Sequence, residues 1–399
     1  MRRVRLALPD LGGVRLRLYV TTLNPTDSLM NGFLPAAESL DWDVTLLTDQ
    51  PDRYAGFDVL QADVRDARAV IETIAAHHPP DVIFSNSDHL QAETALAAAY
   101  FGLPGKDWRA CVTAKNKALT RRRLAEAGVE TVRSVRLHPD DPPPTTLPYP
   151  AVLKPREGVA SENVLFCPGP ERLAIAAKEV WARLPGVALV AEEYLDGPLR
   201  TLETLGDGHV RQVLGGFHTT LGPPPCFVEE RLDWGPPGGH ATHIIAALDA
   251  LGVGFGACHT EYVVTGAGPR IIEVNYRAIG DNCDFLLADL LGVPLFEWIL
   301  RVHAGEPAPV PPAPPSGHGA AVSVVADRSG VIEVAAPAID LRTAGVRLAH
   351  RPCRAAGDTV AVTGTNRDYL GVIRAIGPTR PAVDAAIGAF RAEHPWVIS

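Results

Sequence analysis

Residues 257–281 constrain this chain more than any other segment, because they place acidic and amide side chains in two short apolar strands around a glycine-rich turn. Successive strand residues point to opposite faces of a sheet. Glu273 and Asn275 are therefore expected to share one face, while Ile272 and Val274 take the other. The polar side chains are either ligands or acids on a solvated sheet face.

The turn at residues 266–269 decides which residue of the first strand joins that face. If the turn contains an odd number of loop residues, Glu261 lies directly opposite Glu273. Oxygen ligands from Glu261, Glu273 and Asn275 then converge on one point. Such oxygens suit Mg²⁺, which keeps several waters and completes its shell with substrate phosphates. The pattern predicts a magnesium site on this hairpin.

Composition bounds the class of protein. The chain has 399 residues, which is longer than one ordinary domain, and 46% of them are hydrophobic and 21% are charged. We expect roughly two to four domains. The formal net charge of -9 argues against nucleic-acid binding, which needs clustered basic surface. Small molecules are the expected partners.

The six cysteines are expected to be free thiols in a reducing compartment, since they form no CxxC motif and no Cys/His pair with zinc spacing. No apolar run reaches the length of a membrane span. Near the N-terminus, Pro9, Asp10 and Arg15 interrupt the apolar stretch that a signal peptide needs. We therefore expect a cytoplasmic protein with no membrane partner.

Residues 16–105 alternate strand-like and helix-like segments, which predicts a parallel sheet of β-α-β units. The expected strands are 16–22, 43–48 and 81–85, and the expected helices are 66–78 and 88–101. Binding groups in such sheets lie at the carboxyl ends of strands, which draws attention to 21–24 and to 85–88, including Ser87. Turn and capping chemistry explains these residues equally well. No GxGxxG follows the first strand.

The rest of the chain divides at proline-rich segments. A helix is expected to begin near Thr113, and a loop at 139–150 follows it. A mixed α/β region then runs to about residue 305. The stretch 307–317 is too rich in proline for a helix or a central strand, so it is predicted to be a stiff connector. Short strands and a helix at 381–393 complete the chain.

Two lysines have surroundings that suit phosphate binding. Lys117 lies in an amphipathic helical segment, and Lys154 ends an apolar strand. The loop 157–164 follows, and its backbone N–H groups and Ser161 are placed to close over a polyphosphate. It contains a single glycine. Each lysine alone would more often be a surface residue.

The segment 188–198 is an apolar strand that becomes acidic and then turns at an Asp-Gly-Pro sequence. Such a segment can present backbone groups to the edge of an adenine, while its side chains line an apolar slot. By itself, strand plus turn is the simpler interpretation. The order of these features along the chain, ending in the hairpin 257–281, is far more specific than any one of them.

This series resembles the ATP-grasp superfamily over nearly the whole chain, and within it the carboxylate–amine (L-amino-acid) ligase branch. The resemblance implies an α/β fold with α+β lobes, an N-terminal parallel-sheet domain and a C-terminal β-rich cap. The implied boundaries are 1–105 for the N-terminal domain, 106–306 for the ATP-grasp domain with lobes at about 106–186 and 187–306, 307–317 for the connector, and 318–399 for the cap.

Site residues follow from the resemblance. It implies that the ATP phosphates are bound by Lys117, Lys154 and Ser161, and that the hinge that holds adenine is formed by Glu192, Glu193, Tyr194 and Leu195. It also implies that Mg²⁺, with Mn²⁺ as an alternative, is bound by Glu261, Glu273 and Asn275. Arg277 is implied to steady the transferred phosphoryl group. The family usually has an acidic residue for the ribose where this chain has Leu199, so Glu203 is a possible substitute.

Other residues are candidates for substrate contact. His259 is expected either to touch the acyl-phosphate or amine, as a catalytic group beside Arg277 and Lys154, or to be structural. His218 and Glu229 lie in segment 215–240, which is expected to line the acceptor pocket. Asp281 either fixes an amino group or caps the following helix, and capping is the expected role.

The expected reaction is ATP-dependent amide bond formation between a small-molecule carboxylate and an amine, through an acyl-phosphate, with release of ADP and phosphate. The expected setting is dipeptide, siderophore or other natural-product biosynthesis, by a possible homodimer. Two alternatives remain open. One keeps the fold and changes the acceptor, giving a carboxylase or a phosphotransferase. The other is a noncatalytic nucleotide-binding protein.

Overall fold

The computed structural model describes residues 15–139, 141–142, 144–313 and 316–399. Pro9 and Asp10, on which the signal-peptide argument rested, lie outside this part, as do residues 140 and 143 of the first proline-rich loop and 314–315 of the connector. In the described part of the chain, none of the helices has both the length and the apolar character that crossing a bilayer requires.

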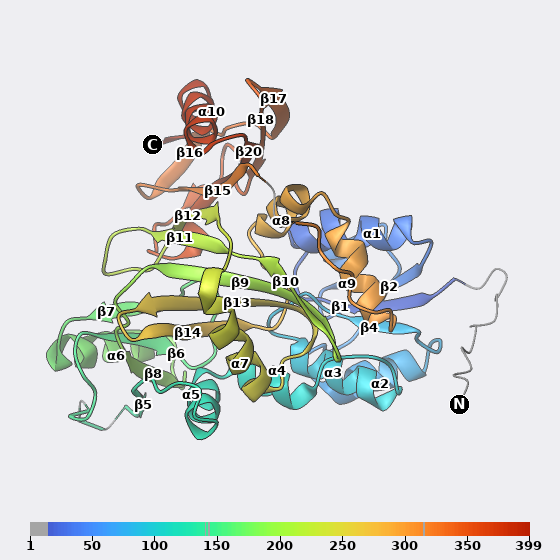
Figure 1. Ribbon diagram of the computed structural model, residues 1–399, viewed down its shortest axis with the longest axis horizontal. Helices are drawn as coiled ribbons and strands as arrows, with labels where there is room; N and C mark the ends of the chain where they lie inside the picture. The colour runs from blue at the N-terminus through green and yellow to red at the C-terminus, as the bar shows by residue number, and fades with distance from the viewer. Residues whose placement is uncertain (1–14, 140, 143, 314–315) are drawn as a thin grey trace.

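The N-terminal domain contains a parallel sheet, as predicted, and its strand order is β3-β2-β1-β4 (Figure 1). Its strands are β1 (Arg17–Thr21), β2 (Asp43–Thr48), β3 (Val59–Gln61) and β4 (Val82–Phe84), and its helices are α1 (Leu34–Ser39), α2 (Ala67–Ala75) and α3 (Gln91–Tyr100). Strand β3 and helix α1 were not predicted, because three and six residues are too few to establish a period.

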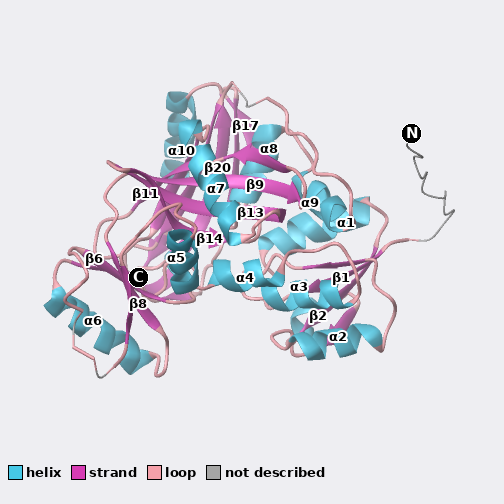
Figure 2. Cartoon of the chain, turned by 60° about the horizontal axis from the view of Figure 1, so that its bottom comes forward, coloured by secondary structure: helices cyan, strands magenta, loops and turns pink. Residues whose placement is uncertain are grey.

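A small antiparallel lobe follows, with strand order β5-β8-β6-β7 and one covering helix (Figure 2). Its elements are β5 (Ser134–Leu137), β6 (Ala151–Pro155), β7 (Leu165–Cys167), β8 (Leu189–Glu193) and α6 (Pro170–Arg183). Before it come α4 (Trp108–Lys115) and α5 (Lys117–Glu126). The single helix expected near Thr113 is therefore wrong. The chain breaks at Asn116, whose side chain accepts a hydrogen bond from the Leu119 N–H and begins a new helix at Lys117.

The largest sheet is antiparallel and has ten strands. Its order is β14-β13-β9-β11-β12-β15-β20-β18-β17, with β10 paired to β9. These strands are β9 (Leu199–Asp207), β10 (Arg211–Gly215), β11 (Phe217–Leu221), β12 (Glu229–Trp234), β13 (Phe255–Thr265), β14 (Gly268–Asn275), β15 (His318–Val325), β17 (Ile339–Thr343), β18 (Val346–Pro352) and β20 (Tyr369–Gly377). Because β12 pairs with β15, the sheet continues without interruption from the central lobe into the C-terminal segment.

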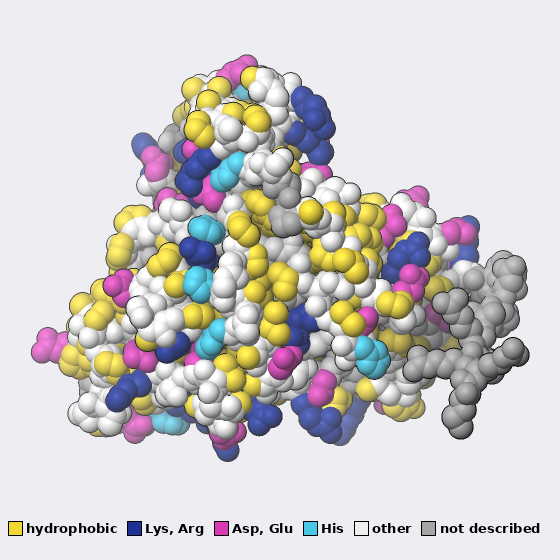
Figure 3. Space-filling model, viewed as in Figure 1, with side chains coloured by type: hydrophobic (Ala, Val, Ile, Leu, Met, Phe, Trp, Pro, Cys, Tyr) yellow, Lys and Arg dark blue, Asp and Glu magenta, His cyan; other side chains and the backbone are white. Residues whose placement is uncertain are grey.

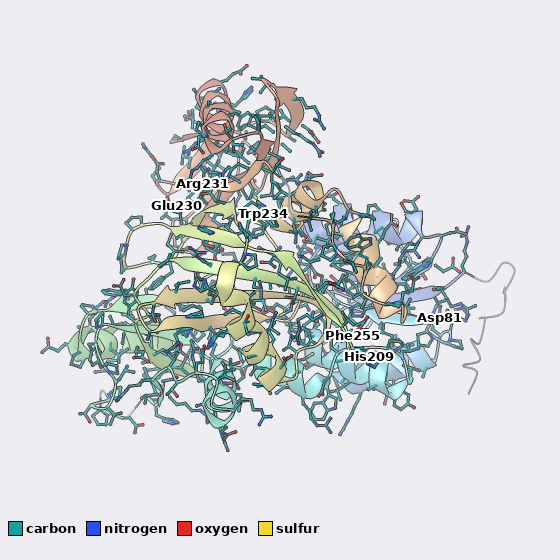
Figure 4. The ribbon with its side chains drawn as sticks, viewed as in Figure 1. Asp81, His209, Glu230, Arg231, Trp234 and Phe255 are labelled. Atoms are coloured by element: carbon teal, nitrogen blue, oxygen red, sulfur yellow. The ribbon has the colours of Figure 1, made fainter. Side chains whose placement is uncertain are left out.

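Helices α7 (Ala241–Leu251), α8 (Cys283–Leu291) and α9 (Leu295–His303) accompany this sheet. The C-terminal segment adds β16 (Gly330–Val334), β19 (Thr359–Val360), β21 (Val397–Ile398) and α10 (Arg380–Glu393), which confirms the helix expected at 381–393. Figure 4 labels Arg231 on β12, beside the C-terminal segment, and Phe255 at the start of β13, beside the N-terminal domain.

A shared core joins the N-terminal domain to the large sheet. Phe33 packs against Phe84 and against Phe296 of α9, with ring centroids 4.6 Å and 5.0 Å apart. The contact links the carboxyl end of β4 to α9, which packs against β13 and β9 of the large sheet. On the face drawn in Figure 3, acidic and basic side chains are interspersed with apolar ones and form no broad basic surface.

Candidate functional site

A cavity of about 510 Å³ lies between the N-terminal domain, the small lobe, the large sheet and the C-terminal segment. Fifteen of the seventeen residues predicted for the site line it. They are Ser87, Lys117, Lys154, Ser161, Glu192, Glu193, Tyr194, Leu195, Glu229, His259, Glu261, Glu273, Asn275, Arg277 and Asp281. Glu203 and His218 are not among its lining residues.

The hairpin of β13 and β14 places Glu261 directly opposite Glu273, as predicted. The condition attached to that prediction is wrong. Thr265 pairs with Gly268, so the loop between them has two residues, an even number. The required register comes from a bulge, because Ile272 is an extra residue on β14 between two pairs. As a consequence, Ile272 lines the cavity beside Glu273 and does not take the opposite face.

The hairpin offers a donor set for a hard cation. Glu261 and Glu273 supply carboxylates, and Asn275 lies in the next row of β14 with its amide nitrogen 3.4 Å from Glu261 Oε1. Three or more His, Cys, Asp or Glu side chains grouped to hold a metal do not occur among the described residues. Two carboxylates and an amide oxygen fit Mg²⁺, which leaves most of its shell to water and phosphate oxygens.

His259 connects the hairpin to β9. Its Nδ1 is 2.8 Å from Glu203 Oε1 and its Nε2 is 3.3 Å from Glu261 Oε1. Both partners are carboxylates, so each ring nitrogen must carry a proton. Burial alone would lower the pKa of His259, but Glu203 and Glu261 raise it to about 10. His259 is thus a fixed cation that orients Glu261.

This contact corrects the expectation for Glu203. The register of β9 and β13 pairs Glu203 with His259, and the Glu203 residue is only 2% exposed. It is therefore unable to substitute for a ribose ligand. Leu199, at the position to which the resemblance assigns that ligand, does line the cavity.

The two lysines lie in buried ion pairs. Lys117 Nζ is 2.7 Å from Glu273 Oε1, and Lys154 Nζ is 2.7 Å from Glu192 Oε2. Arg121 Nη2 also lies 2.8 Å from Glu192 Oε2. Burial raises the pKa of Glu192, but Arg121 and Lys154 outweigh it and lower the pKa to about 2. Glu192 therefore holds Lys154 at the cavity wall as a fixed charge.

The hinge has one backbone donor available. The Glu193 N–H donates to Arg133 O at 2.9 Å, and the Tyr194 N–H donates to Pro150 O at 3.0 Å. No acceptor for the Leu195 N–H occurs among the described residues. Tyr194 and Leu195 both line the cavity, and the Tyr194 ring meets Phe166 edge-on with ring centroids 5.1 Å apart. An apolar wall beside one free donor suits the edge of an aromatic base.

The loop 157–164 is strained where glycine would normally relieve strain. Ala160, Ser161 and Asn163 all have positive φ values, of 56°, 55° and 57°. Non-glycine residues in this region cost about 1 kcal/mol or more each. The loop is therefore held in place by contacts with its surroundings.

Glu229 and Asp281 face the cavity without a lysine or arginine partner in the described part of the chain. Burial raises the pKa of Glu229 to about 8, and Glu261 and Asp281 add to the effect. Burial likewise raises the pKa of Asp281. Capping, the role expected for Asp281, is wrong, because α8 begins after Asn282 with no side-chain capping bond.

His218 lies outside the cavity. It is exposed on β11, where it pairs with Arg200 of β9 and Asp233 of β12, and Leu221 is the residue of that strand that lines the cavity. The sequence also failed to identify several lining residues. These include Asn366, Arg367 and Tyr369 of the C-terminal segment, and no pattern in the sequence marked them.

No family model matches this chain. An uncharacterized protein, y4rH, of Sinorhizobium fredii is 29% identical over 340 residues, which cover 79% of this chain and 68% of that protein. Dapdiamide A synthase of Enterobacter agglomerans is 22% identical over 193 residues, 45% of this chain and 46% of that protein. Among solved structures, the L-amino acid ligase of Bacillus licheniformis has a TM-score of 0.82 at 20% identity and covers 96% of this chain and 99% of that one.

The sheet arrangement and this likeness define the class: the chain has the ATP-grasp fold. The expectation of a mixed α/β protein with a parallel N-terminal sheet and a β-rich C-terminal cap is confirmed.

Proposed function

We propose that this protein is an ATP-dependent ligase that joins a small-molecule carboxylate to an amine and releases ADP and phosphate. The proposal rests on one observation. Two buried lysines, a free hinge amide, the oxygen donors of the hairpin and Arg277 converge on a single cavity. Similarity to dapdiamide A synthase and to an L-amino acid ligase supports the same reaction class.

The proposed chemistry has two steps. The γ-phosphoryl group of ATP passes to an oxygen of the substrate carboxylate, giving an acyl-phosphate and ADP. The amine then attacks the acyl carbon, a C–N bond forms, and phosphate leaves while the amine nitrogen loses its proton. Both steps gain mostly from positioning and from neutralisation of negative charge, so no covalent nucleophile of the enzyme is required.

Each residue has a role in that scheme. Glu261, Glu273 and Asn275 would hold Mg²⁺, or Mn²⁺ in its place, which supplies positive charge at the phosphates when bound. Lys154, fixed by Glu192, and Arg277 neutralise charge on the transferred group. His259 positions Glu261 and takes no proton, because both of its nitrogens already donate to carboxylates.

The remaining lining residues divide between the two ligands. Lys117 and Ser161 would contact phosphates, and the Leu195 N–H would contact adenine. Ser87 of the N-terminal domain, Glu229 at the start of β12 and Asp281 just before α8 also line the cavity, and we assign them to contacts with the acid and the amine. A small amino acid as one of the substrates, in dipeptide or natural-product biosynthesis, fits a cavity of about 510 Å³.

The test is a panel of carboxylic and amino acids incubated with ATP, Mg²⁺ and hydroxylamine. Hydroxamate together with ADP is the expected result, because hydroxylamine captures an acyl-phosphate. AMP in place of ADP would overturn the phosphoryl-transfer scheme. Label from ¹³C-bicarbonate in the product would favour a carboxylase instead. ATP binding without turnover across the panel would favour a noncatalytic nucleotide-binding protein.

A further inference from the structure

A turn of the C-terminal cap, residues 363–368, touches both halves of the cavity. We refer to it as the cap turn. On one side it contacts the strained loop 157–164. The Asn366 N–H donates to Ala160 O at 3.1 Å, and Arg367 Nε lies 2.8 Å from Glu162 Oε1. These bonds join the loop to an element more than two hundred residues later in the chain.

On its other side the cap turn holds Glu229. The Asn366 side chain accepts from the Glu229 N–H at 3.1 Å, and its amide nitrogen is 3.4 Å from Glu229 Oε2. Tyr369, directly after the turn, donates its hydroxyl to Glu229 O at 2.7 Å. Asn366 therefore bonds the loop through its backbone and Glu229 through its side chain.

The cap turn is rigid enough to transmit a displacement. Asp368 is 2% exposed, and its carboxylate accepts from the N–H groups of Thr363, Gly364 and Thr365 at 3.0, 2.7 and 3.3 Å. Thr365 and Asp368 also form a reciprocal capping box. With three amides on one buried carboxylate, the turn moves as a unit.

The packing around Gly364 also shows close contact between the cap turn and the segment before Glu229. Gly364 has a φ of 71°, and a Cβ at this position would collide with Cys226 Sγ, which lies on the segment leading to β12. The cap turn thus sits closely on the segment that carries Glu229. A shift of Glu229 on substrate binding would press directly on the turn.

We propose that Asn366 is a positioning residue that couples occupancy of the substrate pocket at Glu229 to closure of the loop 157–164 over ATP. The inference rests on the proposed function and adds its regulation. The loop contains three residues in an unfavourable backbone region, so it needs an external restraint. The cap turn supplies that restraint, and its contact with Glu229 makes the restraint depend on whether substrate is bound. Loop closure then follows arrival of the substrate, which protects an acyl-phosphate from water.

Two variants separate the halves of this link. Asn366→Ala removes both side-chain bonds to Glu229 and keeps the backbone bond to Ala160. Arg367→Ala removes the ion pair with Glu162 and keeps the contacts with Glu229. Arg328→Ala is the matched control, because Arg328 is an exposed cap arginine whose one ion pair among the described residues is with its neighbour Asp327.

The first measurement is hydrogen exchange of the loop 157–164 in the full chain without ligands. Faster exchange in Arg367→Ala than in the wild type and in Arg328→Ala is expected. Equal exchange in all three proteins would overturn the idea that the cap turn restrains the loop. This readout requires no turnover, so it stands even if the proposed reaction fails.

The second measurement is the affinity for a nonhydrolysable ATP analogue, with and without the acid or amine that the hydroxamate panel identifies. In the wild type the substrate should tighten analogue binding about fivefold or more, within the usual range for coupled sites. Asn366→Ala should lose that factor while analogue binding without substrate changes little. An unchanged factor in Asn366→Ala would refute the coupling. A panel without any hydroxamate would instead refute the proposed reaction.

Discussion

Replacing Glu192 with glutamine should destabilise the small lobe more than any exposed substitution in it. Glu192 is the only acidic partner of Lys154 in the described structure, and it also pairs with Arg121. All three side chains are nearly inaccessible to water. Removing the negative charge leaves Lys154 buried without a carboxylate partner in the described structure and leaves Arg121 with only its longer, 3.5 Å contact to Glu130, which is the costly way to break a buried ion pair.

The size of the effect follows from the pKa of Glu192. Its fall from the ordinary value of 4.5 to about 2 corresponds to about 3 kcal/mol of stabilisation of the ionised form. Because the pKa is lower in the folded than in the unfolded state, this stabilisation is complete above pH 4.5. It is lost as the pH falls toward 2, with roughly 1 kcal/mol gone by pH 4.

Urea unfolding at pH 7 and pH 4 tests this. Trp181 reports on the same lobe, since it lies half-buried on α6 and donates to Val187 O at 2.9 Å. Glu179→Gln is the control, because Glu179 forms an exposed pair with Arg172 and should change stability by less than about 1 kcal/mol. Equal losses in the two variants, or a difference that does not shrink at pH 4, would refute the argument.

Three further outcomes are expected. Glu273→Gln should lower kcat by at least about a hundredfold while the circular dichroism spectrum is unchanged; near-normal turnover would contradict the metal assignment. Gly197→Ala should raise the KM for ATP, since Gly197 has a φ of 148° and a Cβ there would overlap the Val264 carbonyl oxygen beside the hinge. An unchanged KM would show that the hinge accommodates a Cβ at residue 197 without moving. His218→Ala should leave kcat and KM within about twofold, because His218 lies outside the cavity; a larger loss would place this histidine back in the site.

Strand periodicity predicted the metal-binding face of the hairpin, whereas the roles of the hinge, the lysines and Arg277 came from the resemblance to the ATP-grasp superfamily. Glu273 and Asn275 share a face of β14, and the strand ends of the N-terminal sheet do reach the cavity. The pairing of Glu261 with Glu273 was correct for the wrong reason. A bulge at Ile272 sets the register, and no residue preference in the sequence marks it.

Long-range register could not be predicted. Glu203 lies 56 residues before His259, and only the pairing of β9 with β13 brings the two side chains together. Asn366 reaches Glu229 across 137 residues for the same kind of reason. Such contacts depend on strand order, which the pattern of apolar and polar residues along one strand does not encode.

The uninterrupted sheet from the central lobe into the cap limits how this protein could be dissected or redesigned. Cutting the chain before β15 would leave β12 as an open edge strand, with unpaired backbone groups free to join another molecule. A truncated variant should therefore aggregate, and a cap exchanged between homologues would need to preserve the β12–β15 hydrogen-bond ladder. New substrate preferences are better introduced by side-chain changes at the cavity wall than by swapping modules.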